Sequence, residues 1–150
     1  MRMLLSLAAV AAVAAATTAP AGATTNGCAP VALSGTTTLN GATGTVEGTL
    51  TGTIGHQPAV VHSVTTILGG EQRGAVMFLA TTHTLTLGAL QLRTSDNARL
   101  VPTPTPGVFH AVSRLEVVSG GTGFVVGVGE IDFRGGITAT WKQIRGQICG

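Results

Sequence analysis

Four histidines are the side chains of this sequence best suited to acid–base chemistry, because an imidazole changes its charge near neutral pH. They are His56, His62, His83 and His110. In an extended chain, His62 and His110 each share a strand face with flanking valines. We therefore expect both to point into the protein, either as structural histidines or as groups that hold a ligand. His83 lies in a Thr-rich stretch and is expected to be exposed, and His56 is expected in a turn.

Three further residues complete the candidate binding site. Arg114 falls on the strand face of His110, and Glu130 falls on a later strand that can pair with it. Arg114 and Glu130 would form either a pocket clamp or a cross-strand pair at the surface. Trp141, the only tryptophan, would plug the core or stack on a ligand. The predicted ligand-binding residues are therefore His62, His110, Arg114, Glu130 and Trp141.

Other chemistries find little support in the sequence. No histidines have metal-ligand spacing, and no serine lies in a nucleophile elbow. Gly121-Thr122-Gly123 superficially resembles a dinucleotide-binding turn, but a strand rather than a helix is expected to follow it. We therefore predict no catalytic residue, no metal and no cofactor, and we favour a binding protein over an enzyme.

The elements that must position these residues are strands. Gly, Thr and Val dominate, and apolar residues recur with period two rather than at helical spacing. Residues 45–54 alternate most clearly, with Val46, Leu50 and Ile54 on the face expected to be buried. Turns are expected at residues 69–72 and 95–97, and a proline-rich connector or rim loop at 102–107. The predicted strands are residues 45–54, 60–68, 74–87, 89–94, 98–101, 108–118, 124–133 and 137–148.

Eight strands joined by short turns indicate an antiparallel meander. A meander of this length protects its edges by closing into an up-and-down barrel or by folding into a β-sandwich. Glycines within the strands favour the barrel, because they permit sharp curvature. The predicted fold is therefore an all-β, eight-stranded antiparallel barrel, with a β-sandwich as the alternative.

The first residues predict export. Met1-Arg2-Met3 precedes an uncharged Ala- and Leu-rich run, residues 4–16, and Ala21-Gly22-Ala23 fits a signal-peptidase site. The apolar run is shorter than the ~20 residues of a membrane span. We expect a cleaved signal peptide at residues 1–23 and a single domain at 24–150, secreted or held in the periplasm or cell envelope, with no membrane span after cleavage.

Two cysteines bracket the predicted domain. Cys28 and Cys149 are the only cysteines, and an even pair in an oxidising compartment is most simply a disulfide. Charged residues make up 9% of the chain and the formal charge is +2, without a basic cluster. Nucleic acids and anionic membranes are therefore not expected as partners.

One segment carries a family resemblance. Residues 117–131, VVSGGTGFVVGVGEI, resemble the GGTG-x-F-x-G-x-x-G region of the dirigent and allene oxide cyclase-like barrels. The closing Gly146-Gln147-Ile148-Cys149 is similar to the last strand of small secreted bacterial proteins of that type. The resemblance implies an eight-stranded barrel with an apolar cavity, in a family whose plant members guide or cyclise small hydrophobic molecules. The chain has no tyrosine, and the match includes no acid or base, so no catalytic residue is carried over.

These observations leave three functional hypotheses. The first is a secreted barrel that binds a small hydrophobic ligand in its interior. The second is a structural or surface-interaction protein, suggested by Thr-rich strand faces and low charge. The third is an enzyme of the allene oxide cyclase type, either a cyclase or an isomerase, which requires ionisable groups that converge inside the barrel.

Overall fold

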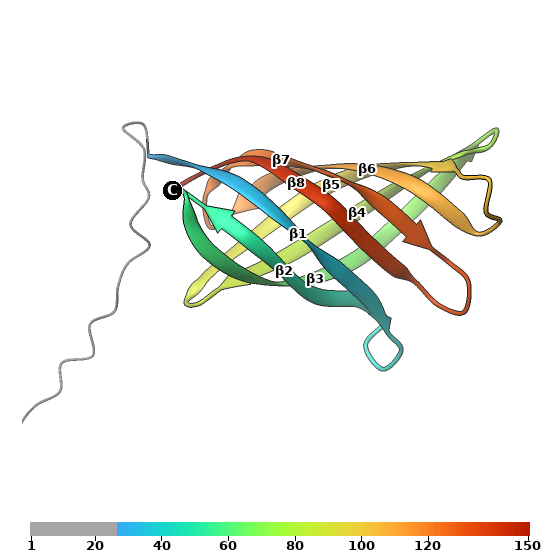
Figure 1. The fold of residues 1–150 in the computed structure, drawn as a ribbon, viewed down its shortest axis with the longest axis horizontal. Helices are drawn as coiled ribbons and strands as arrows, with labels where there is room; N and C mark the ends of the chain where they lie inside the picture. Colours follow the sequence, from blue (N-terminus) through green and yellow to red (C-terminus); the bar gives the residue numbers. More distant parts are fainter. Residues whose placement is uncertain (1–26) are drawn as a thin grey trace, which may run out of the picture.

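The computed structural model describes residues 27–150 and consists of one closed β-barrel (Figure 1). Each strand is hydrogen-bonded to the strands before and after it in the chain, and the last strand pairs with the first. The predicted all-β antiparallel barrel is therefore confirmed, and the sandwich alternative is wrong. The signal peptide predicted at residues 1–23 lies outside the described residues. The described part of the chain contains no helix long and apolar enough to cross a membrane.

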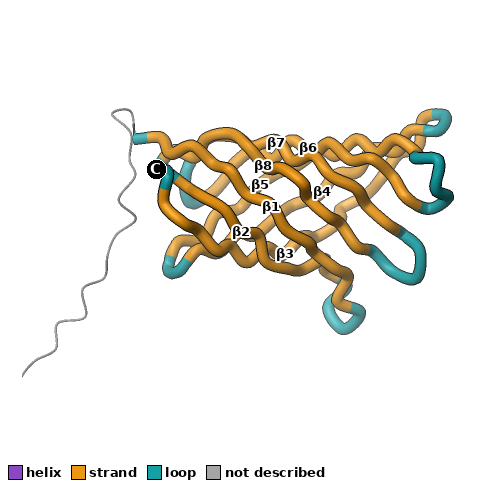
Figure 2. Tube along the Cα trace, viewed as in Figure 1, coloured by secondary structure: helices purple, strands orange, loops and turns teal. Residues whose placement is uncertain are grey.

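The barrel has eight strands linked by short turns at both ends (Figure 2). Their bounds are β1 Cys28–Asn40, β2 Thr45–Ile54, β3 Gln57–Arg73, β4 Val76–Leu87, β5 Leu90–Pro102, β6 Val108–Ser119, β7 Thr122–Asp132 and β8 Thr138–Cys149. The turns after β2, β4 and β6 lie at the end that also holds both termini of the described chain, which we call the disulfide end. The turns after β1, β3, β5 and β7 lie at the opposite end.

The predicted strand number is correct, but two errors cancel within it. The first strand, β1, was missed, because its Ala-, Gly- and Thr-rich sequence shows only a weak apolar alternation. The predicted strands 89–94 and 98–101 are one strand, β5, and the turn residues Ser95-Asp96-Asn97 lie in its middle. The turn expected at residues 69–72 likewise lies within β3. In β5 the tertiary structure overrides turn propensity, because the Asp96 side chain is buried inside the barrel.

Inward-facing side chains fill the barrel in two apolar clusters. The cluster near the disulfide end is built around residues such as Leu33, Val61 and Leu92. The cluster near the opposite end is built around Leu100 and its neighbours. Trp141 is half-buried and packs against both clusters. The clear alternation predicted for β2 is confirmed at Val46 and Leu50, which are both buried.

The pairing of β1 with β8 closes the barrel, and a disulfide joins these two strands. Cys28 and Cys149 are register partners across this pairing and are bonded to each other, as the sequence predicts. They are 121 residues apart in the chain. The covalent bond thus ties the first residue of β1 to the last residue of β8 and encloses nearly the whole described chain.

Loss of this disulfide should destabilise the fold without changing its topology. In the chain-entropy model, a loop of this length corresponds to about 4–5 kcal/mol of stabilisation, as an upper figure. We expect the variant with Cys28→Ser and Cys149→Ser to unfold at a lower urea concentration, with a free energy of unfolding reduced by up to that amount. Equal urea midpoints for the variant and the oxidised wild type would contradict this account.

A glycine beside Trp141 allows two strands to approach closely. The pairing of β7 with β8 is irregular between Val128 and Gly129. A Cβ atom on Gly129 would lie 2.2 Å from the backbone oxygen of Thr140, which is closer than a carbon and an oxygen can pack. A side chain at this position therefore requires the backbone to move.

We expect Gly129→Ala to lower the free energy of unfolding by about 1–3 kcal/mol, the range seen when extra carbons are forced into a packed interior. Gly69→Ala is the matched control, because a Cβ atom on Gly69 of β3 meets nothing within 4 Å. Chemical denaturation of both variants provides the test. Equal loss of stability at the two positions would show that the close approach at Gly129 does not constrain the barrel.

Candidate functional site

A cavity opens at the disulfide end of the barrel. It has a volume of about 230 Å³ and we call it the cup. No ionisable or hydroxyl-bearing side chain lines it: the lining residues are Gly27, Ala29, Leu33, Ile54, Gly55, Val61, Leu85, Leu87, Leu90, Leu92, Gly120, Ile148, Cys149 and Gly150. The disulfide and the short glycine-containing turns form part of its wall. The chemistry of the cup is therefore that of an apolar container.

A layer of buried polar side chains lies deeper in the barrel than the cup. Each of these residues is at most 8% exposed, although the strands that carry them also bury apolar side chains. We call this layer the polar belt, and it consists of Thr37, Ser63, Thr65, Thr81, His83, Thr94, Asp96 and Ser113. Six of the eight residues come from the consecutive strands β3, β4 and β5. The polar side of the interior is thus concentrated on one wall of the barrel.

The centre of the polar belt is a buried ion pair between His83 and Asp96. The Nδ1 atom of His83 donates a hydrogen bond to Oδ2 of Asp96, and Thr81 Oγ1 donates to the same oxygen over 3.2 Å. The backbone N–H of His83 donates to Thr94 Oγ1 over 3.3 Å. The side chain of Asp96 is fully buried and that of His83 is 8% exposed. This environment holds the imidazole in one orientation.

The polar belt is not completely satisfied. The second carboxylate oxygen of Asp96, Oδ1, is buried without a hydrogen-bond partner. The Nε2 atom of His83 forms no hydrogen bond within the described part of the chain either, but it is not fully buried. A buried polar atom without a partner costs free energy, so such atoms in a native protein indicate either stored strain or a place for another molecule.

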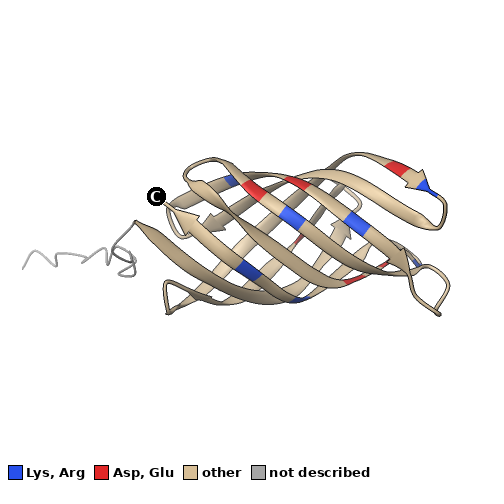
Figure 3. Ribbon diagram, turned by 90° about the horizontal axis from the view of Figure 1, so that it is seen from above, with Lys and Arg blue, Asp and Glu red and all other residues tan. Residues whose placement is uncertain are grey.

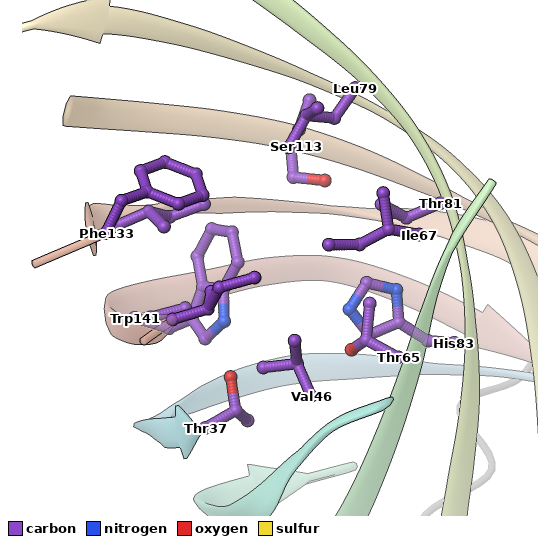
Figure 4. Close-up of a pocket in the computed structure, with 14 residues that line it drawn as sticks. Thr37, Val46, Thr65, Ile67, Leu79, Thr81, His83, Ser113, Phe133 and Trp141 are labelled. Atoms are coloured by element: carbon purple, nitrogen blue, oxygen red, sulfur yellow. The ribbon is translucent and has the colours of Figure 1, made fainter. Parts of the chain in front are cut away.

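His83 and Trp141 separate two small cavities in the middle of the barrel. Both residues line a cavity of about 40 Å³ towards the opposite end and a cavity of about 20 Å³ towards the cup. Figure 4 shows the imidazole and the indole on facing walls of the larger of these two cavities. By volume, the larger holds about two or three water molecules and the smaller about one.

The structure brings only one of the five predicted ligand-binding residues into the interior. Trp141 faces inward, whereas His62, His110, Arg114 and Glu130 face outward. The expectation that His62 and His110 point into the barrel is therefore wrong. Glu130 pairs over 3.0 Å with Lys142 of β8, and the Arg114 guanidinium lies 4.7 Å from the ring centre of Phe124. Arg114 and Glu130 thus belong to separate surface contacts rather than to a clamp.

The error arose because β3 and β6 carry valines on both faces. His62 shares its face with Val60, but Val60 is 64% exposed, while its neighbour Val61 is 3% exposed. Successive residues of a strand face opposite sides of the sheet. If the inner face is assigned to the wrong set of alternate residues, every side chain of that strand is predicted on the wrong side. In β6 the inward face carries Ala111 and Ser113 together with the larger Leu115 and Val117, while Val112 and Val118 lie on the exposed face.

The same inversion hid His83, which was expected to be exposed. Threonines occur on both faces of β4, so the Thr-rich sequence does not reveal which face is buried. One signal was present: His83 lies two residues from Leu85, and Asp96 lies four residues from Leu92 on the strand that follows. Matching the apolar residues of two consecutive strands would have placed both polar residues inside.

Charges on the outside of the barrel are few and scattered (Figure 3). After β7, the Arg134 guanidinium donates hydrogen bonds to both carboxylate oxygens of Asp132 over 3.0 and 2.8 Å and lowers the pKa of Asp132 to about 2. Near the start of β2, a hydrogen bond from Thr45 holds the pKa of Glu47 below its usual value. These pairs lie at turns, and no group of three or more metal-ligating side chains occurs among residues 27–150.

The ion pair predicts a characteristic pattern of stabilities. His83→Leu should lower the free energy of unfolding by about 3–5 kcal/mol, because it leaves a buried carboxylate without its partner. The double variant with His83→Leu and Asp96→Val should recover most of this loss, because it replaces the pair by apolar groups. Denaturant unfolding measures both effects.

The exposed pair of Glu130 and Lys142 is the control for these variants. Lys142→Met should change the free energy of unfolding by less than about 1 kcal/mol, because exposed ion pairs contribute little. If the double variant at positions 83 and 96 is as unstable as His83→Leu alone, the loss of stability in His83→Leu does not come from an unpaired buried charge.

Comparison of the chain with family models, with curated proteins and with solved structures gave no match. An eight-stranded barrel does not by itself indicate a function, because unrelated proteins with different functions can share one fold. The interior of the barrel is therefore the basis for assigning a function.

Proposed function

We propose that this protein binds a small hydrophobic molecule in the cup at the disulfide end of the barrel. The single observation that carries the proposal is the cavity of about 230 Å³ whose side chains are all apolar. Small-molecule sites are typically concave and mainly apolar, and the mouths of β-barrels are a common location for them. The bound molecule would be held by burial of its apolar surface, which contributes roughly 25 cal/mol per Å².

The size of the cup limits the ligand. Typical sites for drug-sized molecules measure roughly 300–1,000 Å³, so this cavity is at or below the lower end of that range. An engineered apolar cavity of about 150 Å³ accommodates benzene. A molecule with one or two rings, or a short alkyl chain, therefore fits entirely within the cup. A larger molecule, such as a three-ring dye or a long lipid, would extend through the open mouth.

A surface-interaction role is the second candidate, and one feature favours it. β3 pairs with β2 only as far as Thr65, yet β3 continues to Arg73. The backbone edge of residues 66–73 is therefore without a neighbour on the β2 side, and Leu68 on this segment is 64% exposed. However, the segment contains an irregularity in its pairing with β4 between Ile67 and Gly69, and a charged pair, Glu71 with Arg73. Bulges and charges are devices that keep strand edges from pairing, so ligand binding is the better supported role.

An enzyme of the cyclase or isomerase type also receives less support. The groups proposed to converge in the interior, His62, His110 and Glu130, lie on the outer surface. The interior pair of His83 and Asp96 borders cavities of about 40 and 20 Å³, which have room for the end of a bound molecule but not for a whole organic substrate. We further propose export to an oxidising compartment, with which the disulfide is compatible.

Blocking the cup should abolish binding. Ala29 faces the cup from β1, whereas Ala32 of the same strand faces outward and is exposed. We expect Ala29→Trp to weaken binding of the apolar dye N-phenyl-1-naphthylamine by at least about tenfold, because the indole occupies the ligand volume. Dye fluorescence during titration gives the affinity.

Ala32→Trp is the matched control, since it adds the same indole to the outer face of the same strand. Its dye affinity should equal that of the wild type. Absence of dye binding to the wild type, or equal binding to the two variants, would contradict the proposed function.

A further inference from the structure

On three consecutive strands the inward-facing side chains change from apolar to polar below the cup. The cup is lined by Val61 of β3, Leu85 of β4 and Leu92 of β5. The next inward-facing residue on each strand, about 7 Å further along the strand from the mouth, is polar. These residues are Ser63, His83 and Thr94, and all three are buried. The side chains below the cup therefore offer hydrogen bonds, whereas the side chains of the cup offer none.

The cup and the polar belt are connected through shared wall residues. Leu33, Leu85 and Ile148 line both the cup and the cavity of about 20 Å³ below it. That small cavity is also lined by Ser63 and His83. A molecule seated in the cup thus has its inner end next to the cavity that leads to the imidazole.

The imidazole of His83 has one nitrogen left for a ligand. Nδ1 donates to Asp96, which fixes the ring and leaves Nε2 as the only ring atom that can form another hydrogen bond. Nε2 has no such partner among the described residues. It donates a hydrogen bond when the imidazole is protonated and accepts one when it is neutral. A hydroxyl group satisfies Nε2 in both states, because it can donate and accept.

The buried carboxylate of Asp96 disfavours an anionic head group. A ligand carboxylate would bring a second negative charge to a region where the side chain of Asp96 is fully buried. Burying a charge without a partner costs far more than burying a neutral hydroxyl that forms a hydrogen bond. The best head group is therefore polar and neutral.

We propose that the ligand is an amphiphilic alcohol whose apolar body fills the cup and whose hydroxyl is bound by Nε2 of His83. This inference rests on the proposed function and specifies the ligand class of the same site. His83 is then the residue that determines specificity, and Asp96 is a positioning residue that holds the imidazole.

The experiment compares three probes of similar length: 1-octanol, its isostere nonane, and octanoate. Their affinities are measured by displacement of N-phenyl-1-naphthylamine from the wild-type protein and from the variant with His83→Leu and Asp96→Val. Removal of the head-group interaction should shift the ratio of the 1-octanol affinity to the nonane affinity by about tenfold towards nonane, which corresponds to the loss of one well-formed hydrogen bond. The nonane affinity itself should be retained. In the wild type, 1-octanol should bind more tightly than octanoate.

Two further measurements separate binding by His83 from a structural effect. His62→Leu removes an outward-facing histidine of the neighbouring strand and should leave all three affinities unchanged. The imidazole NMR signals of His83 should shift on addition of 1-octanol and not on addition of nonane, while those of His62 stay in place.

The possible failures are distinguishable. If neither nonane nor 1-octanol displaces the dye, both this inference and the proposed function are overturned. If nonane binds but the affinity ratio is the same in wild type and double variant, the apolar cup remains and the alcohol assignment is wrong. Tighter binding of octanoate than of 1-octanol in the wild type would also overturn the assignment.

Discussion

The pairing of β1 with β8 is the constraint on which the rest of this structure depends. It turns a meander into a closed barrel, so no strand is left at an edge over the paired length. Closure with eight strands also fixes the width of the interior, which at this size is just enough for side chains to fill. The disulfide between Cys28 and Cys149 joins the same two strands and strengthens closure where the chain begins and ends.

Closure makes the interior a single narrow column in which each layer has a different composition. The apolar cluster near the disulfide end is open to the cup, and the second cluster closes the opposite side. Between them lies the polar belt with its buried pair, His83 and Asp96. A buried ion pair is seldom more stable than apolar side chains of the same size, so its presence is better explained by specificity or binding than by stability.

The sequence predicted elements well where one face of a strand was clearly apolar. In β2, glycines and threonines separate Val46 and Leu50, and the buried face is unambiguous. In β3 and β6, valines occupy both faces, and the choice between the faces of Val60 and Val61 could not be made from local pattern. This ambiguity affected the predicted binding site most, because it decided whether each histidine was assigned to the inside or the outside of the barrel.

The sequence by itself determined the all-β class, the antiparallel order and the pairing of the two cysteines. These properties follow from local alternation, turn residues and cysteine count, which do not require knowledge of distant contacts. Only the tertiary structure decided which histidine lies inside and that Asp96 belongs to a strand rather than a turn. The reason is physical: the inner face of a strand is selected by the volume available in the closed barrel and by cross-strand partners, such as Asp96 for His83, that lie far apart in the sequence.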